Sequence, residues 1–90
     1  MVDFEWDEDK QRSNKEKHGI AFLRARILFD GRPVLTVATS RGEEARFATT
    51  GAVDDRYYTA IWTLRGEKVR IISVRKARDA EKRDHRAIHG

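Results

Sequence analysis

The chain has 90 residues, with 19 Lys/Arg against 15 Asp/Glu and a net charge of +4. This length allows one modest core, so we expect residues 1–90 to form a single domain. The absence of cysteine excludes disulfides, thiolate chemistry and cysteine-ligated zinc. No apolar run approaches the ~20 residues that cross a bilayer, and the first residues lack a signal-peptide pattern. We therefore expect a cytoplasmic protein without membrane contact.

Positive charge is concentrated toward the C-terminal end of the chain. Residues 65–90 hold nine Lys/Arg against four Asp/Glu, whereas residues 1–18 hold four against six. A basic segment favours a polyanionic partner, nucleic acid first, through phosphate contacts and counterion release. An acidic protein partner would also fit, and charge alone does not separate the two.

The first predicted elements are a short strand-like lead over residues 3–6 and a helix after it. Asp7 stands at the expected N-cap, and Gly19 at the expected C-terminal stop. Residues 7–18 contain no apolar side chain, so this helix cannot dock through a hydrophobic stripe. One helix face gathers polar and basic side chains: Lys10, Asn14, Lys17 and His18. This pattern indicates either a solvated helix or one wall of a polar site.

The rest of the chain predicts one more helix, a sheet and a final helix. Apolar residues recur at helical spacing from Ile20 until the turn sequence of residues 30–33. The apolar period then changes to two, which predicts strands over residues 34–38, 44–50, 57–64 and within 66–78. A last helix is expected from Asp79, as its cap, to about Ile88. The predicted fold is α+β: two N-terminal helices, a mainly antiparallel four-stranded meander with a possible N-terminal edge strand, and a C-terminal helix, with the helices on one face.

Strand alternation assigns residues to the two faces of this sheet. In the last strand it predicts Ile72 and Val74 on the core face, and Ile71 on the open face. If Phe47 and Trp62 also face the helices, the open face carries hydroxyls and two guanidinium groups: Arg46, Thr63, Ser73 and Arg75. Such a set would bind a phosphate and stabilise the charge that develops during phosphodiester cleavage. The alternative is a solvated basic surface.

Few residues offer proton transfer or metal binding. Glu44 would orient Arg46 or accept a proton from a ribose 2′-OH, unless the two form only an exposed ion pair. His18 ends a helix, where the dipole favours the imidazolium, so it is a general acid or a cap. His85 and His89 are four residues apart but lack a third ligand nearby, so we expect no metal and no cofactor.

Three sequence motifs follow one another along nearly the whole chain. They are Phe4-Glu5-Trp6-Asp7 with Lys10, Asn14, Lys17-His18-Gly19-Ile20 and Phe22; then Glu44, Arg46, Phe47 and Gly51; and then Arg70-Ile71-Ile72-Ser73-Val74-Arg75-Lys76-Ala77 with Glu81. Together they resemble the BrnT toxin family. The chain departs from the family pattern at Ala21, where a small polar helix cap is usual, at Val74 in place of alanine, and at His85, near a usual tyrosine.

The resemblance implies a fold similar to RelE and ParE toxins, and a metal-independent endoribonuclease that inhibits translation and growth by cutting RNA. It implies a type II toxin–antitoxin pair with a BrnA-like antitoxin that has a ribbon-helix-helix part, so that operator DNA is bound only through the complex. By motif position the catalytic residues would be Lys17, His18, Glu44, Arg46 and Arg75, and the RNA-binding residues Lys10, Ser73, Lys76 and Arg78. The alternatives are a non-catalytic module that binds nucleic acid or antitoxin, and a ParE-like gyrase poison.

Overall fold

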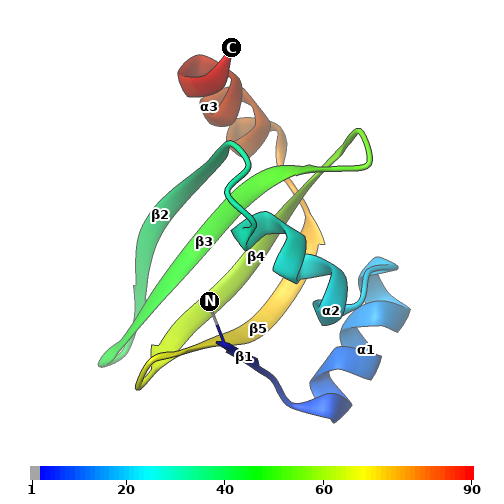
Figure 1. The fold of residues 1–90 in the computed structure, drawn as a ribbon, viewed down its shortest axis with the longest axis vertical. Helices are drawn as coiled ribbons and strands as arrows, with labels where there is room; N and C mark the ends of the chain where they lie inside the picture. The colour runs from blue at the N-terminus through cyan, green and yellow to red at the C-terminus, as the bar shows by residue number, and fades with distance from the viewer. Residues whose placement is uncertain (1–2) are drawn as a thin grey trace.

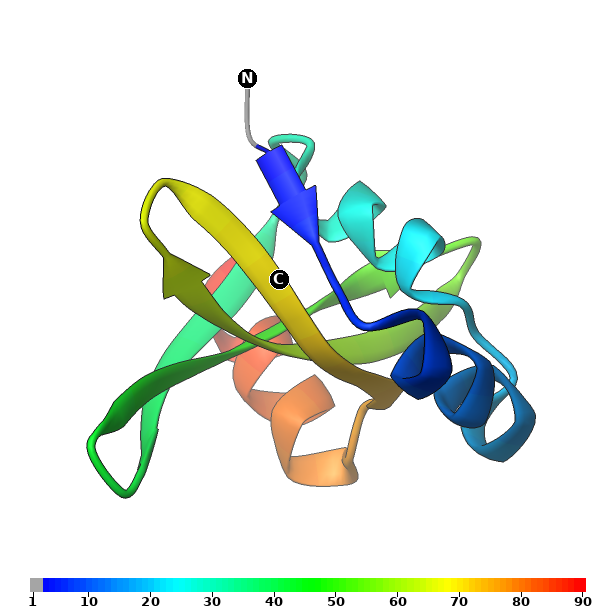
Figure 2. The same cartoon turned by 90° about the horizontal axis from the view of Figure 1, so that it is seen from below.

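The computed structural model describes residues 3–90, in which one five-stranded sheet lies between helices (Figures 1 and 2). The strands are β1 (Asp3–Glu5), β2 (Val34–Arg41), β3 (Glu44–Val53), β4 (Arg56–Arg65) and β5 (Lys68–Lys76), in the order β1-β5-β4-β3-β2. β2 to β5 form the predicted antiparallel meander. The possible N-terminal edge strand is present as β1, so the four strands of the meander become a sheet of five. The sheet is mixed and not antiparallel throughout, because β1 pairs in parallel with the first residues of β5.

Helices cover both faces of the sheet, so the prediction that they share one face is wrong. Helix α2 (Phe22–Ala25) and the 3₁₀ helix η1 (Arg26–Phe29) pack on one face, whereas α3 (Asp79–His89) lies on the other (Figure 2). Helix α3 reaches the sheet mainly through polar contacts, such as that of Glu81 with Thr59. A helix held in this way carries no hydrophobic stripe that would reveal its side of the sheet. None of the helices in residues 3–90 is long and apolar enough to span a membrane.

The hydrophobic core lies between α2, η1 and the sheet. Phe22, Leu28, Ile71 and Val74 are almost completely buried there. Gly51 of β3 allows η1 to approach closely, because a Cβ at this position would lie 2.9 Å from side-chain atoms of Leu28 and Val34. This close approach fixes the distance between the helix layer and the sheet.

Four aromatic rings continue the core toward the β1 edge. Phe4 contacts Phe29, Phe29 contacts Trp62, and Trp62 stacks on Phe47, with ring centroids 5.3, 5.4 and 4.6 Å apart. Phe47 and Trp62 therefore face the α2 side, as predicted. By strand alternation, the side chains of Arg46 and Thr63 lie on the opposite face.

A β-bulge in β5 changes the predicted face of two residues. Trp62 of β4 pairs with Ile71, but the preceding Ile61 pairs with Ser73, so Ile72 is the additional residue. Ile71 is buried in the core, whereas Ile72 is only half-buried. The prediction that Ile72 rather than Ile71 faces the core is therefore wrong. Beyond the bulge the alternation resumes, with Val74 buried as expected.

Helix ends follow the predicted signals at three of four positions. Helix α1 (Glu8–His18) begins after Asp7, whose carboxylate accepts hydrogen bonds from two backbone N–H groups, and ends at Gly19 with φ 73°. The bond from the Lys10 N–H is the main cause of a lowered pKa at Asp7. Ala21 gives α2 no side-chain cap, as expected from its sequence. The N-cap of α3 is corrected from Asp79 to Arg78.

Candidate active site

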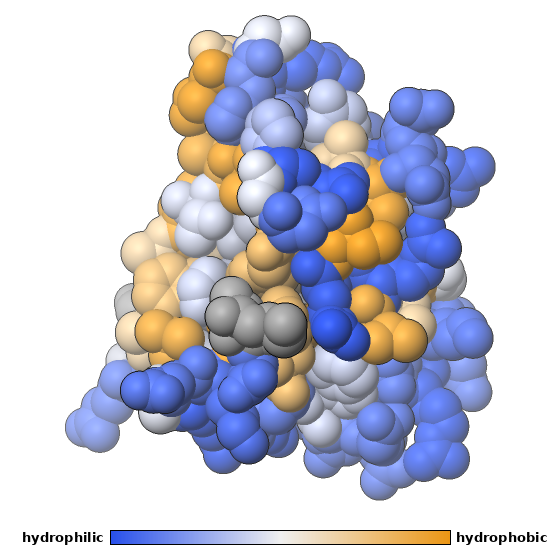
Figure 3. All heavy atoms as spheres, in the orientation of Figure 1, coloured by the Kyte–Doolittle hydropathy of each residue, from blue (hydrophilic) through white to orange (hydrophobic). Residues whose placement is uncertain are grey.

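Helix α1 is anchored to the sheet by one buried amide. Asn14 donates to the carbonyls of Val74 (2.7 Å) and Ile20 (3.2 Å), and its oxygen accepts from the Val74 N–H (3.2 Å) and the Ser73 hydroxyl (3.1 Å). The amide thus occupies the edge of β5 beyond the end of β1, where a further strand would otherwise pair. An all-polar helix is thereby packed without a hydrophobic stripe. Figure 3 shows the hydrophilic surface on the side where Figure 1 places α1.

The anchored helix brings its C-terminal end to the end of β5. Five side chains line a groove of about 490 Å³ there, which we call the basic groove: Lys17, His18, Arg75, Lys76 and Arg78. The first two belong to the last turn of α1, the next two end β5, and the last precedes α3. Four of the five are Lys or Arg and none is a carboxylate. The charge and shape of the groove therefore suit an anion of high charge density.

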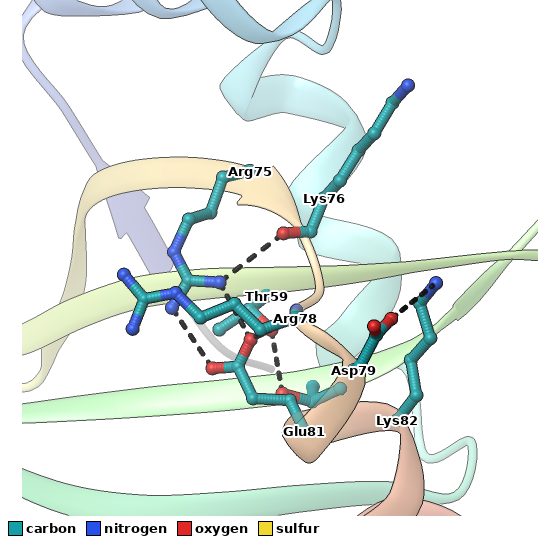
Figure 4. Close-up of polar contacts among 8 residues, drawn as sticks. Thr59, Arg75, Lys76, Arg78, Asp79, Glu81 and Lys82 are labelled. Carbon is teal, nitrogen blue, oxygen red and sulfur yellow. Dashed lines mark hydrogen bonds and ion pairs between the residues drawn. The ribbon is translucent and has the colours of Figure 1, made fainter.

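Arg75 is held in place by a carboxylate of α3 (Figure 4). Its Nη1 and Nη2 donate to the two oxygens of Glu81 at 2.7 and 3.0 Å, and Nη1 also contacts the carbonyl of Lys76 at 3.3 Å. A guanidinium has five N–H donors, so donors remain for a ligand. In the close-up, the Lys76 side chain extends away from this pair. The pair therefore orients one cation and leaves its neighbour free to move.

Glu81 is the centre of a polar chain across the α3 face of the sheet. It also accepts from the Arg78 N–H (2.7 Å) and the Thr59 hydroxyl (3.2 Å), and Thr59 in turn bonds to Thr50 (2.7 Å). Partial burial would raise the pKa of Glu81, but the hydrogen bonds from Arg75 and Arg78 outweigh it and lower the pKa to about 2. Glu81 is therefore an anion at neutral pH and serves as a fixed counter-ion, not as a general base.

Arg46 and Glu44 lie on the same face but outside the basic groove. Arg75 pairs opposite Thr59 of β4, whereas Arg46 lies beside Thr63, four residues further along that strand. This separation is about 13 Å along the strand. The guanidinium of Arg46 donates to Glu44 at 3.1 and 3.2 Å, so the two form a local ion pair. Of the two arginines expected to act together, only Arg75 reaches the groove.

The remaining predicted residues have separate places. Ser73 donates to Asn14 and so contributes to the docking of α1. Lys10 is exposed on α1, two turns before the groove. His85 and His89 contact the carbonyls of Pro33 and Val34 through Nε2, at 3.1 and 2.8 Å. Within residues 3–90 no group of three His, Cys, Asp or Glu side chains gathers as a metal site.

Sequence reasoning missed the roles of two residues: Asn14, which anchors α1, and Glu81, which orients Arg75. Asn14 was part of the polar helix face, and Glu81 was part of the family resemblance, but neither was assigned a role at the site. The available signal at Glu81 was its position in the first turn of a predicted helix, three residues after Arg78 and six after Arg75. The signal at Asn14 was a helix with no other means of docking.

The geometry suits chemistry on a phosphodiester. Guanidinium and ammonium groups stabilise negative charge on phosphoryl oxygens. His18 adds an imidazole, the side chain that most often serves as a general acid or base in enzymes. Because several cations and no carboxylate line the groove, its donor set supplies positive charge directly and does not favour a bound metal cation.

Comparison with known proteins assigns the chain to a family. No curated protein sequence matches it. The family described as the ribonuclease toxin BrnT of type II toxin–antitoxin systems matches residues 6–81, which include Asn14, the whole basic groove and Glu81. The chain belongs to the BrnT family and is a ribonuclease toxin of a type II toxin–antitoxin system.

Proposed function

We propose that the basic groove is where this toxin cuts RNA, by attack of a ribose 2′-OH on the adjacent phosphorus. The observation that carries the proposal is the meeting of Lys17 and His18, at the end of α1, with Arg75, Lys76 and Arg78 in one groove. These residues come from opposite ends of the chain and are brought together by the Asn14 anchor and the Glu81 ion pair. The reaction we assign to the groove is therefore a metal-independent transesterification.

In this reaction the 2′-oxygen forms a bond to phosphorus and the bond from phosphorus to the 5′-oxygen breaks. The products are a 2′,3′-cyclic phosphate and a 5′-hydroxyl. Arg75, oriented by Glu81, stabilises the charge of the phosphorane together with Lys76 and Arg78. His18 accepts the proton of the 2′-OH as a neutral imidazole, and the ammonium of Lys17 beside it donates a proton to the leaving 5′-oxygen.

We assign Glu44 and Arg46 no part in the proton transfers. Their ion pair lies about four residues along β4 from the position of Arg75, a strand distance of about 13 Å. Glu44 therefore lies far from the phosphate that Arg75 would hold. We likewise assign Lys10 and Ser73 no part in the bond-breaking step. Lys10 is an exposed cation on α1, and Ser73 donates a hydrogen bond to Asn14 that helps to dock this helix.

We further propose a BrnA-like antitoxin as the protein partner, with a ribbon-helix-helix part that binds operator DNA when the two proteins are in complex. This proposal rests on the resemblance of the sequence motifs to BrnT toxins. The same resemblance supports a RelE-like fold for residues 1–90 and action in the cytoplasm. Expression of the toxin alone, and then with its neighbouring gene, should show RNA degradation that the neighbour prevents.

Incubation of the purified protein with end-labelled RNA in EDTA tests the mechanism. We expect fragments that end in a 2′,3′-cyclic phosphate. Arg75→Ala and His18→Ala should each lower the cleavage rate by about 100-fold or more. Arg12→Ala is the matched control, because it removes an exposed α1 cation that lines no part of the groove. Full activity of both Arg75→Ala and His18→Ala, or loss of all cleavage in EDTA, would remove the mechanism.

A further inference from the structure

A second cationic groove adjoins the basic groove along the molecule. It has a volume of about 490 Å³, and we call it the flanking groove; it is lined by Asp55, Arg56, Tyr57, Lys76, Lys82 and Arg86. Lys76 lines both grooves, so the two grooves adjoin each other at this residue. None of the other residues of the flanking groove has a place in the cleavage reaction. Its positive charge therefore requires a separate explanation.

Two of its cations are arranged by the fold to face the same space. Lys82 and Arg86 are four residues apart on α3 and so share one helix face. The Arg86 guanidinium lies over the Tyr57 ring, 5.8 Å from its centroid, and the His85 ring supports Tyr57 at 5.2 Å. The Lys82 ammonium is 3.9 Å from Asp79, a contact too long for a strong hydrogen bond. Among residues 3–90, Arg86 forms no ion pair and Lys82 forms only this long one with Asp79, so both cations can still contact a ligand.

A third groove in the same molecule contains a cation paired with a carboxylate. It has a volume of about 420 Å³, and its lining includes Arg24 of α2, Asp54 of the β3–β4 turn, and Arg56 of β4, which also lines the flanking groove. There Arg24 forms a direct ion pair with Asp54. The flanking groove instead has four cations against one carboxylate, Asp55. Positive charge is therefore concentrated on the side that continues from the basic groove.

We propose that the flanking groove binds backbone phosphates of the nucleotides next to the cleaved linkage. The proposal rests on the assignment of RNA cleavage to the basic groove, since a substrate chain held there must continue past Lys76. Cations from α3, β5 and the first residue of β4 line this path, an arrangement that suits a charged backbone rather than one small anion. Contacts of this kind bind substrate and transition state equally, so they lower KM and leave kcat unchanged.

The test is a double variant, Lys82→Gln with Arg86→Gln, which removes two charges and keeps most of each side-chain stem. Arg83→Gln is the matched control, because Arg83 is exposed on the same helix and lines neither groove. Binding is measured with a fluorescent 2′-O-methyl RNA, which lacks the attacking hydroxyl, across a series of salt concentrations. Loss of two phosphate contacts should weaken binding about tenfold at low salt and reduce the salt slope by about 1.4.

Cleavage kinetics provide the second measurement. The double variant should raise KM about tenfold with kcat within about twofold of the parent. The proposal is overturned if binding and the salt slope match those of Arg83→Gln, or if the double variant loses only its affinity for the antitoxin. If the protein binds RNA through these cations but Arg75→Ala does not slow cleavage, the flanking groove stands and the assigned reaction fails.

Discussion

The two faces of the sheet are held by different kinds of interaction. Under α2 and η1, side chains such as Phe22 and Leu28 are excluded from water and pack against β3, β4 and β5. On the α3 face, Thr50, Thr59, Glu81 and Arg75 form a chain of hydrogen bonds that ends at the basic groove. Apolar burial is non-directional and stabilises the fold, whereas hydrogen bonds fix orientation. The α2 face therefore contributes most of the stability and the α3 face positions the cations.

This comparison predicts that substitutions on the α2 face act on stability first. Phe22 is fully buried between α2 and the sheet. We expect Phe22→Ala to lower the free energy of unfolding by about 3–5 kcal/mol, through lost burial and a cavity. Urea unfolding followed by circular dichroism measures this change. Leu23→Ala is the control, because Leu23 is 55% exposed and its truncation should change the free energy of unfolding by less than about 1 kcal/mol. Equal losses for the two variants would contradict the assignment of the core.

Asn14 connects stability to the site, so its substitution should affect both. Asn14→Ala removes four hydrogen bonds and leaves the Val74 N–H and carbonyl without their side-chain partner. We expect a loss of about 2–3 kcal/mol in the free energy of unfolding. Cleavage should fall even where the protein remains folded, because Lys17 and His18 lose their fixed position. Ser13→Ala, at the exposed neighbouring position, is the control. Normal cleavage by folded Asn14→Ala would show that α1 does not need this anchor.

Asn14 also shows which features of the fold could be predicted from the sequence and which could not. Local patterns predicted the caps at Asp7 and Gly19, the antiparallel meander and the side of the sheet that Phe47 and Trp62 face. They could not predict that Asn14 pairs with Val74, since this contact joins residues 60 positions apart through one side chain. The bulge at Ile72 was equally hidden, because two adjacent isoleucines fit either face until β4 sets the register.

The site itself was only partly predictable for a related reason. Strand alternation places Arg46 and Arg75 on one face of the sheet, but it does not give the distance between the two residues along the strand direction. That distance depends on the register of β3 against β4 and of β4 against β5. The prediction that α3 lies on the same side of the sheet as the other helices was wrong, because the contacts of α3 with the sheet are mainly polar. The position of this polar helix is set by its hydrogen bonds, chiefly those that Glu81 of α3 accepts from Thr59 and Arg75 of the sheet.

Substitution of Glu81, on the α3 face, should lower activity much more than stability. Glu81→Gln keeps the shape of the side chain but removes the charge that pairs with Arg75. We expect a stability loss of about 1–2 kcal/mol and a tenfold or larger fall in kcat, with KM changed little. Asp84→Asn is the control, because Asp84 is exposed on the same helix and lines neither the basic nor the flanking groove, so kcat should be unchanged. A parallel rise in KM without a fall in kcat would assign Glu81 to substrate binding instead.

Acid should weaken the α3 face through the same carboxylate. The pKa of Glu81 is about 2 in the folded protein, against 4.5 for the ordinary group. Because the folded value is the lower one, its stabilising contribution is complete above about pH 4.5 and is lost as the pH falls toward 2. The pair is partly exposed, so we expect only about 1 kcal/mol, less than the full shift would imply. Urea unfolding at about pH 6 and about pH 3 should show a smaller acid loss for Glu81→Gln than for the parent. Asp30, whose pKa Arg32 likewise lowers to about 2, supplies the comparison: Asp30→Asn should also reduce the acid loss, but without changing cleavage at neutral pH.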